Sequence, residues 1–225
     1  MQFFCLVLNK AKWKLRNVYS KFFPPQKPSD YSKYLKLQVS KYLSHELENE
    51  HWSAGQARYI NREFSDIDRS SKILDISCGD GVGLKVFREL GFTDVTGFEY
   101  AEEKANLARR FGYPVYDGDF HDLSIFGSNS FDLIYSSHSL EHALFPVKVM
   151  GEFYRILKGG GTLKLVLPFP DVGPLDAHVA KVELGTDLDD GGEKVLCFVR
   201  NQGFEIINYV FDDYREVEIW ITGTK

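Results

Sequence analysis

Short apolar runs alternate with amphipathic stretches from residue 70 to the end of the chain. Five apolar runs predict buried strands, at 71–77, 93–100, 113–119, 130–137 and 161–168. Four amphipathic stretches bounded by glycine or proline predict helices, at 81–90, 101–112, 146–160 and 192–203. Two last apolar runs, 204–211 and 215–223, are joined by a short turn and predict an antiparallel pair. We therefore expect an α/β fold: a doubly wound, mostly parallel seven-stranded sheet with an antiparallel last strand pair and helices on both faces.

The chain before residue 70 has a different pattern. The prolines of "FFPPQKPSDYSKY" mark a break, so we expect a basic N-terminal arm over 1–30 and one domain over 31–225. Within this domain we expect one or two helices over 31–69 and a cofactor-binding core over 70–168. An acceptor loop and the closing strands would follow over 169–225.

The N-terminal end is strongly basic. Residues 1–45 contain nine Lys or Arg and one acidic residue, although the whole chain has a net charge of -5. The arm can contact an anionic membrane, a nucleic acid or the acidic remainder of the chain, or it can stay solvated. The apolar run in "MQFFCLVLNK" is shorter than the roughly 20 residues that span a bilayer. Residues 1–27 can instead lie on a membrane surface as an amphipathic anchor, or begin with an ordinary packed turn.

The overall composition is that of a globular protein, with 44% apolar residues. The negative net charge argues against a protein that binds nucleic acid over its whole surface. Cys5, Cys78 and Cys197 lie far apart, which argues against a disulfide framework and against a cysteine-type zinc site. We therefore expect a reducing compartment, the cytoplasm, either in solution or at the periphery of a membrane.

The stretch "ILDISCGDGVG" at 73–83 places an acid at the end of a strand and a glycine-rich loop before a helix. Gly79 and Gly81 let the backbone turn sharply and approach a ligand closely. Asp80 within the loop is unfavourable for a pyrophosphate, and the glycine spacing of a dinucleotide site is incomplete, which argues against NAD. The absence of Gly-Lys-Ser/Thr argues against a nucleotide triphosphatase. Asp75 followed by this loop suits a ligand that carries a positive charge and an amine.

Two further acids follow the next strands. Glu99 lies 24 residues after Asp75, at a strand end where a carboxylate accepts both hydroxyls of a ribose. Asp119 follows the third predicted strand and can accept an adenine amino proton, while the ring of Phe120 packs on the base. Ribose, adenine and a cationic amino-acid group together describe S-adenosylmethionine. The alternatives are that Asp75 caps the loop, Glu99 is a solvated strand end and Phe120 belongs to the core.

The chain resembles the class I, seven-stranded S-adenosylmethionine-dependent methyltransferases of the methyltransferase-11 kind. Five motifs carry the resemblance in the order of the family: "LDISCGDG" at 74–81, "GFEY" at 97–100, "GDFHDL" at 118–123, "FDLIYSSHSLEH" at 131–142 and "RILKGGGTL" at 155–163. The resemblance implies S-adenosyl-L-methionine as cofactor and S-adenosyl-L-homocysteine as product. It implies nine cofactor-binding residues: Asp75, Ser77, Gly79, Gly81, Glu99, Tyr100, Asp119, Phe120 and Ser136. We expect Cys78 to pack without a chemical role.

The stretch "SSHSLEH" at 136–142 contains H-x-x-E-H, a zinc-site pattern of one metalloprotease group. Its place directly after the fourth predicted strand is where doubly wound sheets bind ligands, which argues against a protease. Either a histidine here is the general base of methyl transfer, or the stretch binds a divalent cation, or it only shapes the loop. For the cation, His138, Glu141 and His142 would share one face of a helix.

Some ubiquinone-pathway methyltransferases have a similar E-x-x-E-H at this position and use a metal. His138 stands here in place of their first Glu, so we do not predict a metal, and His138, Glu141 and His142 remain candidate ligands.

The segment 168–192 is rich in carboxylates and contains Asp171, Asp176 and His178. The resemblance implies that this segment is the acceptor loop, which binds the methyl acceptor, with His178 joining His138, Glu141 and His142 as a candidate catalytic residue; a solvated loop is the alternative. The carboxylates argue against nucleic acid as acceptor and favour a sugar hydroxyl. No Asn-Pro-Pro-Tyr signature is present, so oxygen is favoured over nitrogen.

We therefore expect an O-methyltransferase that acts on a hydroxyl of a sugar, a glycan or another small molecule. One alternative is an RNA or protein methyltransferase that holds an anionic partner with the basic arm. The other is a non-catalytic binding protein with a methyltransferase fold.

Overall fold

The structure is a computed structural model that describes residues 31–44 and 50–225. The predicted basic arm over 1–30, its membrane contact through 1–27, and Cys5 therefore lie outside the described residues.

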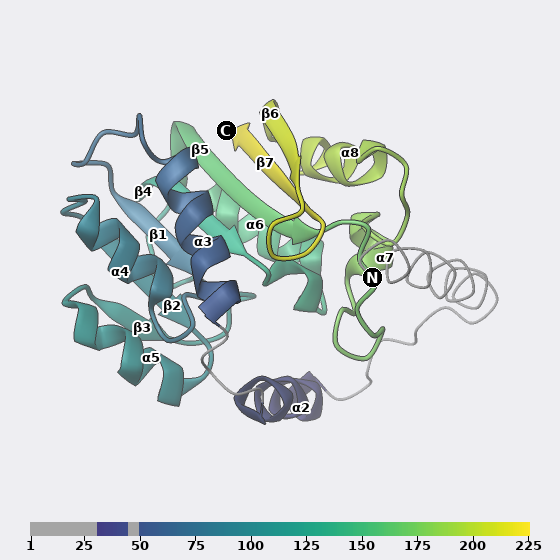
Figure 1. Cartoon of the computed structure of the whole chain (residues 1–225), viewed down its shortest axis with the longest axis horizontal. Helices are drawn as coiled ribbons and strands as arrows, with labels where there is room; N and C mark the ends of the chain where they lie inside the picture. The colour runs from purple at the N-terminus through teal and green to yellow at the C-terminus, as the bar shows by residue number, and fades with distance from the viewer. Residues whose placement is uncertain (1–30, 45–49) are drawn as a thin grey trace.

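Seven strands form one sheet in the order β3-β2-β1-β4-β5-β7-β6 (Figure 1). They are β1 (Ile73–Ile76), β2 (Val95–Glu99), β3 (Val115–Asp117), β4 (Phe131–Ser137), β5 (Leu157–Pro168), β6 (Glu205–Asp212) and β7 (Glu218–Thr224). The first five strands pair in parallel. β7 runs antiparallel to both β5 and β6. The predicted fold class is confirmed.

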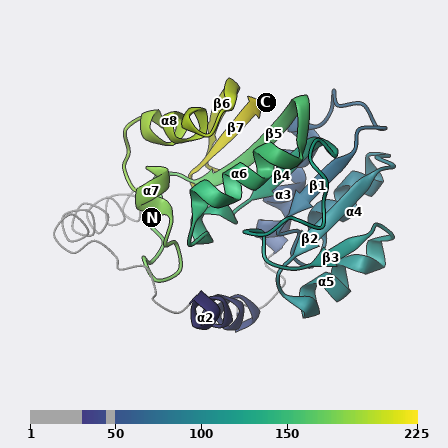
Figure 2. The same cartoon turned by 180° about the vertical axis from the view of Figure 1, so that it is seen from behind.

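Helices cover both faces of the sheet (Figures 1 and 2). One face carries α3 (Glu50–Glu63), α4 (Val82–Glu89) and α5 (Glu102–Ala108), and the other carries α6 (Pro146–Ile156) and α8 (Glu193–Asn201). The remaining helices are α2 (Tyr31–Ser44), α7 (Lys181–Leu184) and two 3-10 turns, η1 (Arg109–Phe111) and η2 (Leu140–His142). The stretch 31–69 thus contains two helices, α2 and α3.

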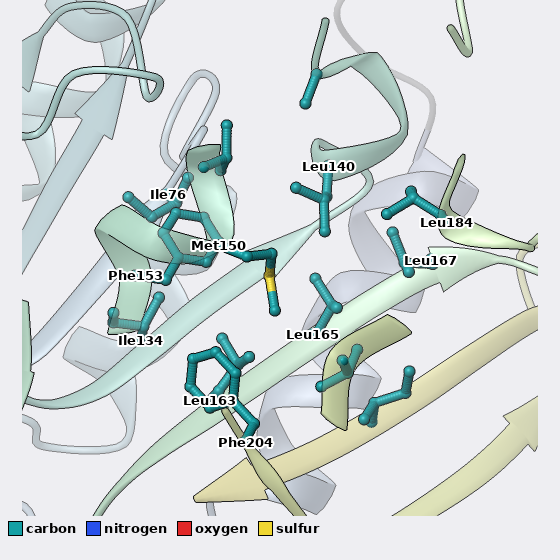
Figure 3. Packing of buried hydrophobic residues seen from close by; sticks show 14 of the residues in the cluster. Ile76, Ile134, Leu140, Met150, Phe153, Leu163, Leu165, Leu167, Leu184 and Phe204 are labelled. Carbon is teal, nitrogen blue, oxygen red and sulfur yellow. The ribbon is translucent and has the colours of Figure 1, made fainter. Parts of the chain in front are cut away.

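The core has two parts because successive strand residues point to opposite faces of the sheet. Ile73 of β1 packs in the cluster beneath α3, α4 and α5. Its neighbours Leu74 and Ile76 pack in the cluster beneath α6 and α8. Figure 3 shows side chains of this second cluster, in which Met150 and Phe153 of α6 lie close to strand residues such as Ile134. β1, β2 and β4 are buried on both faces, which explains why they appear in the sequence as continuous apolar runs, whereas the edge strand β3 exposes Tyr116.

The boundary between α6 and β5 differs from the prediction. The helix expected over 146–160 ends at Ile156, and β5 begins at Leu157 rather than at Gly161. Leu157 is fully buried and extended, and Gly160 adopts a left-handed conformation with φ 75°. The register with β4 shifts here between Phe131 and Leu133. The glycine run therefore forms an irregular first part of a strand instead of ending a helix.

None of the helices in the described residues is long and apolar enough to cross a membrane.

A glycine within β2 is required by close packing. A Cβ on Gly97 would lie 2.9 Å from Sγ of Cys78 and 3.1 Å from side chains of Leu84 and Val115, all of them buried. Cys78 thus packs in the core, as expected from the sequence.

Replacing Gly97 by alanine should lower the free energy of unfolding by about 1–3 kcal/mol, because the extra methyl group overpacks the core. Urea denaturation measures this change. Gly159→Ala is the matched control, since a Cβ there meets no atom within 4 Å. Equal stability of the two variants would contradict the packing described here.

Candidate active site

The predicted cofactor residues lie at one edge of the sheet. Asp75 and Glu99 stand near or at the carboxyl ends of the neighbouring strands β1 and β2, and Ser136 lies near the end of β4. Asp119 follows two residues after β3. Because these four strands are parallel and adjacent, their loops meet at the edge where doubly wound sheets bind ligands.

The loop after β1 has an unusual backbone. Ser77, Gly79 and Gly81 all adopt left-handed conformations, with φ of 55°, 59° and 92°. A Cβ on Gly81 would lie 2.9 Å from the Cα of Ala108, so only glycine permits the close approach of the loop to α5. The non-glycine Ser77 is uncommon in this region of φ, as is often found at functional sites.

Glu99 fastens this loop to β2. Its Oε2 accepts a hydrogen bond from the N–H of Gly79 at 2.9 Å, and its Oε1 accepts one from the N–H of Ala101 at 2.9 Å. The side chain is buried, and this burial raises the pKa of Glu99 in spite of the two hydrogen bonds. Each carboxylate oxygen retains a lone pair, so the residue can still accept a ribose hydroxyl.

Asp75 is the least satisfied group of the site. Asp75 is 1% exposed, and its Oδ2 has no hydrogen-bond partner. Burial and the nearby charge of Glu99 raise the pKa of Asp75 well above its ordinary value. A Cβ on Gly83 would lie 2.6 Å from this Oδ2, so the glycine leaves room for the carboxylate. A buried carboxylate without a partner is costly, and a ligand with a positive charge would offset that cost. The site therefore fits a cationic cofactor such as S-adenosylmethionine.

Asp119 has partners that the sequence did not reveal. Its Oδ1 accepts hydrogen bonds from the backbone N–H of His121 at 2.9 Å and from Nδ1 of His121 at 2.7 Å. The hydroxyl of Tyr31, on α2, donates to its Oδ2. Burial alone would raise the pKa of Asp119, but the bonds from His121 and Tyr31 hold it below its ordinary value. An adenine amino group would thus meet an ionised carboxylate that is shared with Tyr31.

The other three predicted cofactor residues have different surroundings. Phe120 is half-buried against the core cluster and contacts the ring of His121 edge to face, with centroids 4.8 Å apart. Tyr100 is exposed. Ser136 is fully buried, with its Oγ 2.5 Å from the Oγ of Ser139.

The histidine stretch does not form the helical face that was expected for a metal. His138 precedes η2 and adopts a left-handed conformation with φ 50°, which carries its ring toward α3 and β7. Its Nδ1 lies 3.6 Å from Glu141 and 3.3 Å from Glu216, and its Nε2 lies 3.4 Å from Glu218. Its ring also contacts Trp52 of α3, with centroids 4.8 Å apart. His138 is therefore a half-buried imidazole that lies among three carboxylates.

Glu141 and His142 occupy the turn that follows. Glu141 is buried with its Oε2 unpartnered, and burial together with Asp171 raises its pKa well above the ordinary value. Nδ1 of His142 lies 2.9 Å from the carbonyl of Ala177, to which it must donate. Although 38% of the His142 side chain is exposed, desolvation and the ring of His178 lower its pKa to about 4. In the described part of the chain, no three His, Cys, Asp or Glu side chains are arranged to hold a metal ion.

The segment 168–192, predicted to be the acceptor loop, brings His178 to His142. The two rings meet edge to face with centroids 4.8 Å apart. Nδ1 of His178 lies 2.8 Å from Oδ1 of Asp171, a residue that is itself buried. The loop thus places a carboxylate and an imidazole beside the histidine that follows β4.

A buried ion pair completes this side of the site. Nε of Arg215 donates to Glu218 at 2.7 Å, and its Nη2 donates to the other carboxylate oxygen at 3.1 Å. The guanidinium lies 4.8 Å from the centroid of the Trp52 ring. A Cβ on Gly55 would overlap the Arg215 side chain, so α3 has a glycine where the arginine crosses it. Burial alone would raise the pKa of Glu218, but His138 and the bonds from Arg215 lower it to about 2.

The sequence predicted four candidate catalytic residues, His138, Glu141, His142 and His178. It did not predict the groups that surround them. His121 stands within a quoted motif but received no role. Tyr31, Trp52 and Arg215 come from segments without a motif, and no local pattern marks them.

The fold agrees with a class I S-adenosylmethionine-dependent methyltransferase domain, and comparisons with known proteins support this class. Residues 74–165 match the family model of the methyltransferase domain. A sterol 24-C-methyltransferase of Neurospora crassa is 27% identical over 161 residues, covering 64% of this chain and 42% of the relative. A demethylmenaquinone methyltransferase of Chlorobaculum parvum is 24% identical over 172 residues, covering 76% of this chain and 66% of the relative. This chain thus spans less than half the length of the sterol methyltransferase.

Solved structures share the fold. The [4+2]-cyclase SpnF superposes with a TM-score of 0.62 at 18% identity, covering 75% of this chain and 80% of the other. An S-adenosylmethionine-dependent methyltransferase from Mesorhizobium loti superposes with a TM-score of 0.60 at 17% identity, covering 77% of this chain and 100% of the other. The predicted class of domain is confirmed, and so is S-adenosylmethionine as the cofactor of that class.

Glu99→Gln should weaken the binding of S-adenosylhomocysteine by about 10- to 100-fold, because hydrogen bonds to a charged group are worth about 1.5–3 kcal/mol. The neutral amide would also direct an NH₂ group at a backbone N–H. Isothermal titration calorimetry measures the affinity. Glu103→Gln, an exposed residue of α5, is the matched control. Unchanged affinity in Glu99→Gln would show that this carboxylate does not bind the cofactor.

Proposed function

We propose that the protein is an S-adenosylmethionine-dependent O-methyltransferase whose acceptor is a hydroxyl of a sugar, a glycan or another small molecule. One observation carries the proposal: His142 and His178 lie against each other, and each has its Nδ1 engaged with an oxygen. A neutral imidazole that donates through Nδ1 has an unprotonated Nε2. The site therefore offers two proton acceptors beside the cofactor-binding edge of the sheet.

The residues have separate tasks in this reaction. Asp75, Glu99 and Asp119 would hold the amino-acid, ribose and adenine parts of the cofactor. When bound, S-adenosylmethionine supplies an electrophilic methyl group, and its sulfur keeps the electron pair of the bond that breaks. The acceptor oxygen forms the new bond to carbon, and its proton passes to Nε2 of a histidine. A base whose pKa is near neutral pH suits this step, because an alcohol is a weak nucleophile until its proton leaves.

The charge around the histidines limits the acceptor. Glu141, Asp171, Glu216 and Glu218 gather there, and Arg215 is already paired with Glu218. Phosphate-rich acceptors such as nucleic acids would meet repulsion, whereas hydroxyl groups can donate to carboxylates. This supports a neutral polyol over RNA.

Methylation of carbon is the second candidate. The relatives include enzymes named for C-24 methylation of sterols and for methylation of demethylmenaquinone. A base near the acceptor would also serve an activated carbon, so the choice between carbon and oxygen depends on the acceptor.

We further propose the cytoplasm as the site of action.

A screen for S-adenosylhomocysteine formation with simple sugars, a quinol and a sterol tests the acceptor class. The O-methylation proposal expects turnover with a hydroxyl compound and a methyl ether as product. A product methylated on carbon, or turnover with RNA alone, would contradict it.

With the acceptor from this screen, His178→Gln and His142→Gln test the base. Loss of a general base should lower kcat by roughly 10²–10⁴-fold in at least one variant, while the affinity for S-adenosylhomocysteine stays the same. Full activity in both variants would exclude a histidine base at this position. Activity that is lost on addition of EDTA and restored by a divalent cation would instead support the metal role of His138, Glu141 and His142.

A further inference from the structure

The acceptor loop contains a carboxylate and a histidine that are connected in a defined direction. Nδ1 of His178 lies 2.8 Å from Oδ1 of Asp171, and the same Oδ1 accepts the backbone N–H of Gly173 at 2.8 Å. Because an ionised carboxylate can only accept, the hydrogen of this bond stands on Nδ1 of the imidazole. Nε2 is then the unprotonated nitrogen.

The loop is built around this contact. Gly173 lies beneath the imidazole, and a Cβ on it would overlap the His178 ring. Glycine is thus required there by space and not by backbone conformation, since Gly173 is absent from the residues with positive φ. Nζ of Lys181 donates to the carbonyls of Gly173 at 2.6 Å and Asp171 at 3.3 Å, which fixes the backbone on both sides of Val172.

The carboxylate itself is held away from solvent. Asp171 is 1% exposed, its backbone N–H donates to the carbonyl of Thr186 at 2.7 Å, and its Oδ2 has no hydrogen-bond partner. A buried acid with one oxygen on an imidazole and the other unpartnered gains most when that imidazole becomes positively charged. An exposed pair would gain much less.

His142 differs from His178 in this respect. Its Nδ1 faces the neutral carbonyl of Ala177 rather than a carboxylate, and the carboxylate beside its Nε2, that of Glu141, lies 3.9 Å away. Desolvation and His178 lower the pKa of His142 to about 4, which makes His142 a weak proton acceptor.

We propose that Asp171 and His178 form an acid–imidazole dyad on Gly173, in which Asp171 is a positioning residue and Nε2 of His178 takes the acceptor proton. The hydroxyl O–H bond breaks, the proton forms a bond to Nε2, and the carboxylate stabilises the resulting imidazolium. Only the role of the proton acceptor rests on the proposed O-methyl transfer; the dyad itself can be tested without an acceptor.

The first experiment determines the tautomer of His178. Two-bond ¹H–¹⁵N correlation spectra of the full chain resolve the imidazole nitrogens, and the chain has six histidines, so His178→Gln assigns the signals. We expect the Nδ1–H form for His178, and a loss of this fixed form in Asp171→Ala and in Gly173→Ala. The controls are Asp189→Asn, an exposed acid of the same segment, and Gly151→Ala, where a Cβ meets nothing within 4 Å. An Nε2–H form in the unaltered protein, or an unchanged tautomer in Asp171→Ala, would overturn the dyad.

The second experiment measures the reactivity of Nε2. The probe is diethyl pyrocarbonate, and mass spectrometry follows the modification of His178 and of His142 in the same sample. Asp171→Asn keeps an oxygen acceptor for Nδ1–H but removes the charge, so His178 should be modified several-fold more slowly while the rate at His142 stays the same. Equal rates at His178 in the two proteins would overturn the role of the carboxylate.

The two proposals can fail separately. Suppose that the dyad is found but His178→Gln retains full turnover with an acceptor whose oxygen is methylated. Then His178 does not take the proton, and the inference is wrong. If no hydroxyl compound is methylated although the tautomer is as expected, the dyad stands and the proposed O-methyl transfer fails.

Discussion

Two carboxylates are buried at the carboxyl ends of neighbouring parallel strands, and the active-site edge of the sheet is organised around them. Each carboxylate oxygen of Glu99 accepts one hydrogen bond from a backbone N–H, one in the loop that follows β1 and one in the loop that follows β2. Asp75 lies on the adjacent strand with its Oδ2 unpartnered. Glu99 therefore fixes the loop. Asp75 has a buried carboxylate oxygen without a partner, and a positive charge would stabilise it most strongly in such a low-dielectric position.

Buried acids also surround His138, His142 and His178. Glu218 is held by Arg215, Asp171 is bonded to His178, and Glu141 lies between His138 and His142. Three segments of the chain, 138–142, 171–178 and 215–218, supply these groups, so their arrangement depends on the sheet order. The β7 strand next to β5 brings the Arg215–Glu218 pair against Ser137, at the end of β4, and against His138 after it.

The sequence predicted what is local and missed what is brought together by folding. Asp75 and Glu99 could be placed because each ends an apolar run, and the parallel order of such runs puts their ends at one edge. The conformation of His138 could not be predicted, because its left-handed φ moves it out of the helical spacing that the motif implied. Tyr31 and Arg215 reach the site from α2 and from the turn before β7, and only the tertiary fold makes them its neighbours.

The central claim is that the buried carboxyl group of Asp75 has no partner for its Oδ2 until a cationic cofactor binds. Asp75→Asn tests this claim. Calorimetry at pH 8 compares the variant with the unaltered protein in two respects: the affinity for S-adenosylmethionine and the melting temperature without ligand. Burial raises the pKa of Asp75, so the ionised form destabilises the folded state at high pH; the neutral amide should raise the melting temperature and weaken cofactor binding together. A variant that melts lower and binds S-adenosylmethionine as tightly as the unaltered protein would contradict the account.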